Sequence, residues 1–310
     1  PIAQELMNMN YASLLYDIII YDKAPVMMRM LEEVMGAPEM QSGLQKYPHD
    51  HLFNNASWDD LVATLDSAAP KANVRQFSEV WVKQKGMPTI HTAYKDGNIV
   101  ITQSDPYKRG LVWPQKFQVR LIYELVTSRT VNVDMKESTF TIKVAGKPNY
   151  IIPNYDGKGY GHFTLDDEYA VILPKRLITT RNDLTRYALL LTIHDNYLLG
   201  RIPPSHFGEL YRFMMKEHNP LIMSSAVDHM FKIAFDLAPE QRKTLELCMM
   251  DLLGENRTKE CRQYVIRKLG SNATSPELLD KIYSIWQQHN DPLFSEQDYM
   301  NMAYRLAIVR

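Results

Sequence analysis

The stretch FSEVWVKQKGMPTIHTAYKDGNIVITQ, residues 77–103, decides the fold because its hydrophobic pattern changes period within it. Up to about Gln84 the spacing is that of a helix, which we expect to cover residues 74–84. Beyond Gly86 the residues alternate between apolar and polar or are β-branched, and Asp96 and Gly97 separate two such runs, which is a strong hairpin signal. A helical segment is therefore expected to end at about residue 84, with a β-sheet region directly after it.

The β-sheet region continues beyond the hairpin. Three further runs with a strand pattern are residues 116–126, 130–135 and 138–144. Short strands at this spacing favour an all-β, immunoglobulin-like sandwich, which we assign to residues 85–173. The closing segment YIIPNYDGKGYGHFTL, residues 150–165, is rich in turn residues, and its glycine-rich part is interpreted as a tight turn.

Strand patterns end before Pro174, and helical patterns take their place. Gly or Pro separates several of the helix-length blocks, and Ser295 is a candidate cap for the last one. Serial amphipathic helices with short connections predict an all-α, solenoid-like array over residues 174–310. The seven blocks are residues 186–200, 207–218, 225–235, 241–254, 259–270, 276–289 and 296–310.

The residues that precede the β-sheet region, 1–84, have helical patterns. In IIIYDKAPVMMRML, residues 18–31, two apolar sets are out of phase, and Pro25 explains the break because proline is tolerated in a first helical turn but not in a helix interior. The pattern predicts a helix start at about Tyr21–Asp22, with Asp22 as a candidate N-cap. A second start is expected near Ser57, where SWDD resembles a capping box.

The composition excludes several classes of protein and of site. The 310 residues carry a net charge of -1, which gives no electrostatic footprint for nucleic acid or for an anionic membrane. The apolar run LLYDIIIY is too short to span a bilayer and contains Asp17. Cys248 and Cys261 match no zinc spacing, so we expect two free buried thiols. No signal peptide is visible and nothing indicates a compartment, while the missing initiator Met indicates part of a longer protein.

A search for catalytic and metal motifs finds none of the common ones. None of the nine histidines begins an H-E-x-x-H motif, and His49 and His51 are interpreted as surface-loop residues. There is no P-loop, dinucleotide fingerprint or nucleophile elbow. The frequent methionines are interpreted as core residues. Taken alone, these patterns support only a helical segment, a β-sandwich and a helical array.

Residues along nearly the whole chain resemble the aminopeptidase N family of zinc metallopeptidases, of the gluzincin type. The order and spacing are specific in the first 90 residues and weaker in the sandwich and the array. The matching residues are Tyr21, Lys23 and Ala24 with the following VMMRMLEEVMG, Tyr47 with NNASWDDL, then Phe77, Trp81, Gln84, Gly86 and Pro88, then Gln103, and later IIPNYDGKGYGHF and DNYLLGRIPPSHFGEL. Ala24 stands where the family usually has glycine, and Pro25 follows it. GAPEM, residues 36–40, differs from the family's substrate-amine motif in residues and position, so we interpret it as a helix-ending glycine turn.

The resemblance implies a role for one residue of this chain. In the family, a tyrosine at the position of Tyr21 donates a hydrogen bond to the oxyanion that forms when zinc-bound water attacks the scissile carbonyl. A helix N-terminus beside it would add favourable potential for that negative charge. The family's zinc ligands, general base and substrate-amine glutamate lie upstream of this tyrosine. The resemblance therefore implies zinc in the full-length parent and no metal site in this chain.

Two functions are compatible with this resemblance. In the first, the chain is the C-terminal portion of a zinc-dependent aminopeptidase that removes N-terminal residues from peptides, and it is inactive alone. Residues 1–84 are then the C-terminal helical part, or remnant, of a thermolysin-like catalytic domain, and the N-terminal catalytic half packs on them. In the second, the chain belongs to a non-catalytic relative that serves as a scaffold or a peptide-binding surface. The partners implied are peptide substrates, without nucleic acid or membrane.

Overall fold

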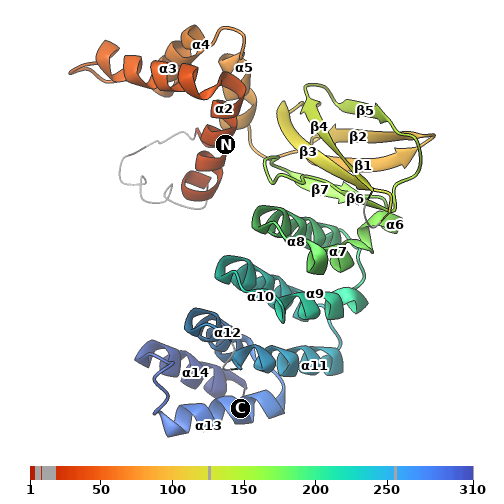
Figure 1. Ribbon diagram of the computed structural model, residues 1–310. Coiled ribbons are helices and arrows are strands. Elements are labelled where there is room, and N and C mark those ends of the chain that lie inside the picture. Colours follow the sequence, from red (N-terminus) through yellow and green to blue (C-terminus); the bar gives the residue numbers. More distant parts are fainter. Residues whose placement is uncertain (4–7, 9–18, 125–126, 255–256, 310) are drawn as a thin grey trace. The chain divides into compact units, whose positions relative to one another are not determined.

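The computed structural model describes residues 1–310 apart from 4–7, 9–18, 125–126, 255–256 and 310 (Figure 1). The chain divides into two compact units, Pro1–Leu165 and Asp166–Arg310. Helices come first, a β-sheet region follows, and helices return to the end of the chain, as the change of period predicts (Figure 1). In the described residues no helix has the length and apolarity that a membrane crossing requires.

The first unit opens with helices that bury one apolar face. Proline and glycine mark their ends: Pro25 lies in the first turn of α2, and Gly36, at φ 96°, ends α2 and precedes α3. Methionine, leucine, valine and tryptophan side chains form their common core, which includes Met27, Leu31 and Trp81. These elements are η2 (Ile19–Lys23), α2 (Ala24–Met35), α3 (Ala37–Asp50), α4 (Trp58–Ala68), α5 (Val74–Phe77) and η3 (Ser78–Val82).

Seven strands of the first unit form two sheets. A four-stranded sheet has the order β5-β2-β1-β7 and a three-stranded sheet the order β4-β3-β6. Phe117 of β3 and Phe163 of β7 meet edge to face at 5.2 Å, so the two sheets share a core. The strands are β1 (Thr89–Lys95), β2 (Asn98–Ser104), β3 (Gln115–Ile122), β4 (Ser128–Met135), β5 (Thr139–Lys143), β6 (Tyr150–Ile152) and β7 (His162–Leu165).

The predicted hairpin is confirmed, whereas two strands were missed. Lys95 pairs with Asn98, and both Asp96 and Gly97 have positive φ, as a two-residue hairpin turn requires. β6 and β7 lie inside the segment predicted only as turns. They are three and four residues long, too short to show a period, and β7 is held by parallel pairing with β1.

The second unit consists of helices that alternate between two rows. α8 contacts α10, α10 contacts α12 and α12 contacts α14, while α7 contacts α9 (Figure 1). All seven predicted blocks are helices, and the shorter α6 and α7 precede them. The elements are α6 (Asp167–Ala170), α7 (Leu173–Thr179), α8 (Asp183–Leu198), η4 (Pro204–His206), α9 (Phe207–Met214), α10 (Pro220–Ala234), α11 (Pro239–Met250), η5 (Asp251–Leu253), α12 (Lys259–Asn272), α13 (Pro276–Gln288) and α14 (Glu296–Val309).

Of the predictions for single residues, two caps are confirmed and two placements are wrong. Ser57 caps α4 in a reciprocal box with Asp60, as SWDD predicts, and Ser295 exchanges hydrogen bonds with Asp298 at the start of α14. Asp22 is not an N-cap, because it lies inside the π-helical turn η2 and α2 begins only at Ala24. His49 lies in the last turn of α3 rather than in a loop, although it is exposed as expected.

Candidate functional site

Tyr21 lies in a π-helical turn, η2, which leads directly into α2. Its side chain is 64% exposed, and η2 contains no buried residue. Ile19, Ile20 and Lys23 of this turn are half-buried, so no side chain of η2 is fully enclosed. Single π-helical turns are rare and often occur at functional sites.

The sequence after Tyr21 explains how a turn of this kind can continue into a helix. Lys23 has right-handed helical angles, φ -78° and ψ -46°, and makes no side-chain cap. Pro25 follows in the first turn of α2, where a backbone N–H would have no partner within the helix. The chain thus passes from η2 to α2 without a break, and this is why Asp22 has no cap position to occupy.

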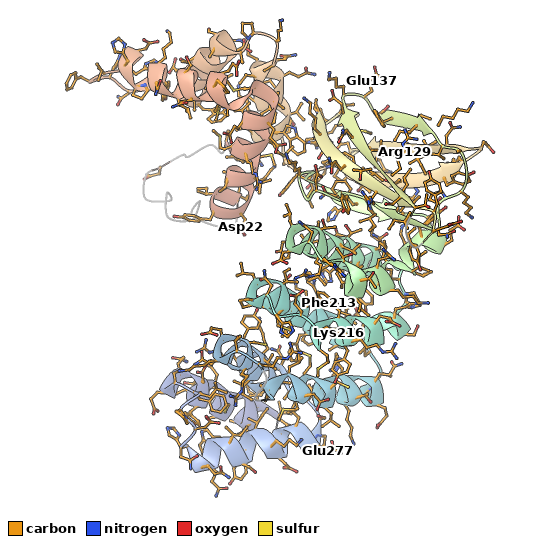
Figure 2. All side chains as sticks on the ribbon, in the orientation of Figure 1. Asp22, Arg129, Glu137, Phe213, Lys216 and Glu277 are labelled. Carbon is orange, nitrogen blue, oxygen red and sulfur yellow. The ribbon has the colours of Figure 1, made fainter. Side chains whose placement is uncertain are left out.

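Lys23 links η2 to a segment distant in the sequence. Its Nζ donates a hydrogen bond to the carbonyl oxygen of Gly86 over 3.3 Å. The side chain is half-buried, and this burial lowers the pKa of Lys23 from its ordinary value. Asp22, next to it, lies at the start of the described helical segment (Figure 2). The turn η2 thus carries the exposed Tyr21 side chain and, two residues on, a lysine side chain that is anchored at Gly86.

An aromatic cluster joins the helical segment to the sheets within the first unit. Trp81 of η3 is fully buried and donates from Nε1 to the carbonyl of Pro114 over 3.0 Å. Its ring lies 6.3 Å from that of Trp113 and meets Tyr160 edge to face at 6.1 Å. Burial raises the pKa of Tyr160, and the negative charge of Asp22 raises it further. The cluster therefore brings the β6–β7 connection close to η2.

Gln103 ties two connections together where β2 ends. Its side-chain oxygen accepts from the backbone N–H of Trp113 at 2.9 Å, and its Nε2 donates to the carbonyl of Glu137 at 2.8 Å. Glu137 is labelled in Figure 2. Gln103 is buried, and both hydrogen bonds are of the kind that a buried amide requires. The arrangement gives this glutamine a role in the fold.

A clamp that the sequence analysis did not identify lies beside Gly86. Arg109 holds the carboxylate of Asp105 with Nε and Nη2, each at 2.9 Å, and these hydrogen bonds keep the pKa of Asp105 well below its usual range. Arg109 also donates to the carbonyl of Lys85 at 2.9 Å and stacks over the Tyr107 ring at 4.8 Å. The available signal was an Asp and an Arg four residues apart in a connection, DPYKR, which is a weak one.

The residues that could bind a metal do not gather. Within the described ranges no three His, Cys, Asp or Glu side chains form a group that could hold an ion. Both cysteines are free thiols, as expected, but only Cys261 is buried as predicted, whereas Cys248 is half-buried. The described residues therefore do not fit a zinc centre, and no step through zinc is assigned to them.

Comparison with known proteins matches residues 1–81 to the Peptidase family M1 domain. That range contains Tyr21, Lys23 and Trp81. The chain belongs to the M1, or aminopeptidase N, family. It corresponds to the C-terminal part of the family's members, as the order of Tyr21, Trp81 and Gly86 predicted. This family is generally zinc-dependent and acts on peptides.

Relatives from three kingdoms support this assignment. Aminopeptidase M1-B of Oryza sativa subsp. japonica is 24% identical over 271 residues, which are 82% of this chain and 31% of the relative. Tricorn protease-interacting factor F2 of Thermoplasma acidophilum is 21% identical over 79% of this chain and 30% of the relative. Thyrotropin-releasing hormone-degrading ectoenzyme of Homo sapiens is 32% identical over 70% of this chain and 23% of the relative. The chain thus spans a third or less of the length of these relatives.

Proposed function

We propose that this chain is the C-terminal portion of a zinc-dependent aminopeptidase that removes N-terminal residues from peptides, with Tyr21 as a catalytic hydrogen-bond donor. The observation that carries the proposal is the exposed Tyr21 side chain on the turn before α2, inside the range matched by the M1 domain. Attack on a peptide carbonyl places negative charge on its oxygen, and a preorganised O–H donor stabilises that charge in the transition state.

The remaining catalytic parts are proposed to lie outside these residues. In the family the zinc ligands and the general base precede the tyrosine, and the described residues hold no metal-binding group. The N-terminal catalytic half is proposed to pack on residues 1–84, and the 310-residue chain is proposed to be inactive by itself. The chain's own contribution is then the placing of one hydroxyl at the reacting carbonyl.

The proposed domain division follows the change of period. Residues 1–84 are the helical end of a thermolysin-like domain, residues 85–173 an immunoglobulin-like sandwich, and residues 174–310 a solenoid-like array. The two sheets with a shared core support the second assignment. The row α8, α10, α12 and α14, in which each helix contacts the next, supports the third.

A non-catalytic role as a scaffold or peptide-binding surface is the second candidate, and one feature of the helical unit favours it. Leu184 and Tyr187 of α8 and Leu221 of α10 are exposed apolar residues around a hollow of about 650 Å³. Exposed apolar clusters of this kind occur at interaction sites. This candidate predicts no dependence of peptide hydrolysis on Tyr21.

The test compares three proteins in one assay of aminoacyl anilide hydrolysis: the full-length protein, its Tyr21→Phe variant and the 310-residue chain. Phenylalanine keeps the ring and removes the hydroxyl, so kcat is expected to fall about a hundredfold, or roughly 3 kcal/mol, with little change in KM. The 310-residue chain is expected to show neither turnover nor stoichiometric zinc by elemental analysis. A Tyr21→Phe kcat above about half of the parental value, with zinc retained, would refute the role of Tyr21.

A further inference from the structure

The side chain of Lys23 anchors the turn that carries Tyr21. No residue of η2 is fully buried, so the turn lacks the close packing of a core element. The Lys23 ammonium instead donates to the carbonyl of Gly86, 63 residues away in the sequence. An ammonium that loses part of its hydration needs such an acceptor, because an unpaired buried charge is costly. The link therefore connects the position of η2 to the position of residue 86.

Residue 86 is itself held from the sheet region. Gly86 has φ +93°, and a Cβ at this position would come within 2.8 Å of the Tyr107 ring. Arg109 covers the same ring and donates to the carbonyl of Lys85. The Asp105 carboxylate, only 1% exposed, holds the guanidinium by two parallel hydrogen bonds. A planar fork bound on both sides leaves the carbonyl of Lys85, next to Gly86, little freedom.

We propose that Lys23 is a positioning residue for Tyr21, and that the Asp105–Arg109 pair holds the Gly86 carbonyl to which Lys23 binds. This inference rests on the proposed role of Tyr21 as the oxyanion donor. Its physical basis is distance: a donor that moves by about 1 Å from the developing oxyanion can lose a hundredfold in rate. The three side chains have no contact with the substrate in this proposal, and they act only through the place of the hydroxyl.

The first experiment uses the full-length protein and two substitutions, Lys23→Met and Tyr21→Phe, alone and together. Lys23→Met keeps the length of the side chain and removes the donor. It is expected to lower kcat about tenfold and to leave KM within about twofold, because ground-state binding does not use the Tyr21 hydroxyl. In the Tyr21→Phe background, Lys23→Met is expected to have no further effect, because residues that act through one another are not additive.

Matched controls separate positioning from general stability. Lys158→Met removes a lysine contact elsewhere in the same unit, the ion pair with Glu33 at 2.6 Å, and is expected to leave kcat unchanged. Lys23→Arg restores a donor and is expected to recover most of the rate. Asp105→Asn, which weakens the fork at Arg109, is expected to lower kcat about threefold, again only when Tyr21 is present.

A second measurement needs no activity. Amide hydrogen exchange of residues 19–24 in the full-length protein is expected to accelerate in Lys23→Met and not in Lys158→Met, since only the first releases η2. Unchanged exchange there overturns the inference, as does an equal loss of kcat with and without the Tyr21 hydroxyl. A nearly parental kcat of the Tyr21→Phe variant would overturn the proposed function and, with it, this inference. Because Tyr21→Phe is also measured alone, this outcome can be told apart from a failure of the inference only.

Discussion

The two compact units differ in what they bury besides apolar side chains. In the described part of the first unit the buried polar residues are uncharged, and the Asp105 carboxylate under Arg109 comes closest to a buried charge. In the second unit charged and imidazole side chains are buried as well. These residues are His194, Glu217, His229, Glu246, Arg257 and Asp298.

Part of the difference follows from the way in which the sheets of the first unit and the helices of the second satisfy their backbones. Strands pair their N–H and C=O groups with neighbouring strands, so the sheets of the first unit need buried amides only at connections. Every helix leaves four N–H and four C=O groups without an intrahelical partner. The second unit contains many helix ends. At the end of α9, for example, Arg257 donates to the carbonyls of Met214 and Glu217. The stability of the second unit therefore depends on a few polar side chains at these ends.

The largest expected effect on the free energy of unfolding is at Glu246, a buried charge of the second unit. Glu246 of α11 is 1% exposed and accepts four hydrogen bonds, from the backbone N–H and hydroxyl groups of Thr274 and Ser275 at the start of α13. Glu246→Ala leaves these donors unsatisfied and is expected to lower the free energy of unfolding by about 3 kcal/mol. Urea unfolding followed by circular dichroism measures it.

The matched control for Glu246 lies on the same helix. Glu240, in the first turn of α11, is exposed, so Glu240→Ala is expected to change the free energy of unfolding by no more than about 0.5 kcal/mol. Equal losses for the two variants would show that the helical unit does not depend on its buried carboxylates.

The next effect concerns pH and the histidine pair between α8 and α10. The rings of His194 and His229 stack at 3.9 Å, and neither Nδ1 has a hydrogen-bond partner among the described residues. Burial lowers the pKa of both, that of His229 to about 3. Lys232 faces both histidines and lowers their pKa further, whereas Asp195 acts on His194, and Asp228 on His229, in the opposite direction.

The sign of the pH effect follows from these directions. The unfolded chain binds protons at about pH 6.5, but the folded chain does not, so acid favours unfolding. Stability due to His229 is complete above about pH 6.5 and is lost as the pH falls toward its folded pKa of about 3. Between pH 7 and pH 5 this loss is about 2 kcal/mol. His229→Phe keeps a ring in the stack and is expected to remove that part of the pH dependence. The free energy of unfolding is measured at several pH values for both proteins. An equal change between pH 7 and pH 5 in the two would contradict this prediction.

The smallest effect is at a helix end of the first unit that is capped locally. Ser57 accepts from the N–H of Asp60 at 3.3 Å, and its own N–H donates to the Asp60 carboxylate at 2.8 Å. Ser57→Ala is expected to cost about 1 kcal/mol in unfolding experiments. Ser67→Ala, which removes a hydroxyl bonded within the same helix to Ala63, is the control and should cost less. If Ser57→Ala lowers the free energy of unfolding as much as Glu246→Ala does, local and distant capping do not differ in the way proposed.

Much of this molecule could be predicted because the signals are local. The alternation after Gly86, the Asp96–Gly97 turn and the Ser57 box involve residues within a few positions of one another, and all three predictions are confirmed. The second strand ending at Gln103 is predicted to within one residue. The role of Tyr21 comes from family resemblance, and it stays a prediction.

The predictions that failed, and the features that were missed, depend on distant partners. β7 exists because it pairs with β1, and Asp22 does not cap a helix because η2 continues into α2. The link from Lys23 to Gly86 spans 63 residues, and the clamp at Arg109 reaches Lys85 over 24 residues. Short strands and single charged residues carry no period, so nothing near them in the sequence marks their partners.

By itself, then, the sequence determined the order of helices, strands and helices, the positions of most turns and the family to which the chain belongs. Only the tertiary structure decided which backbone groups each buried polar side chain satisfies and what holds the turn around Tyr21. The physical reason is that periodicity and turn chemistry act between near neighbours, whereas burial and hydrogen bonding depend on which distant segments the fold brings into contact.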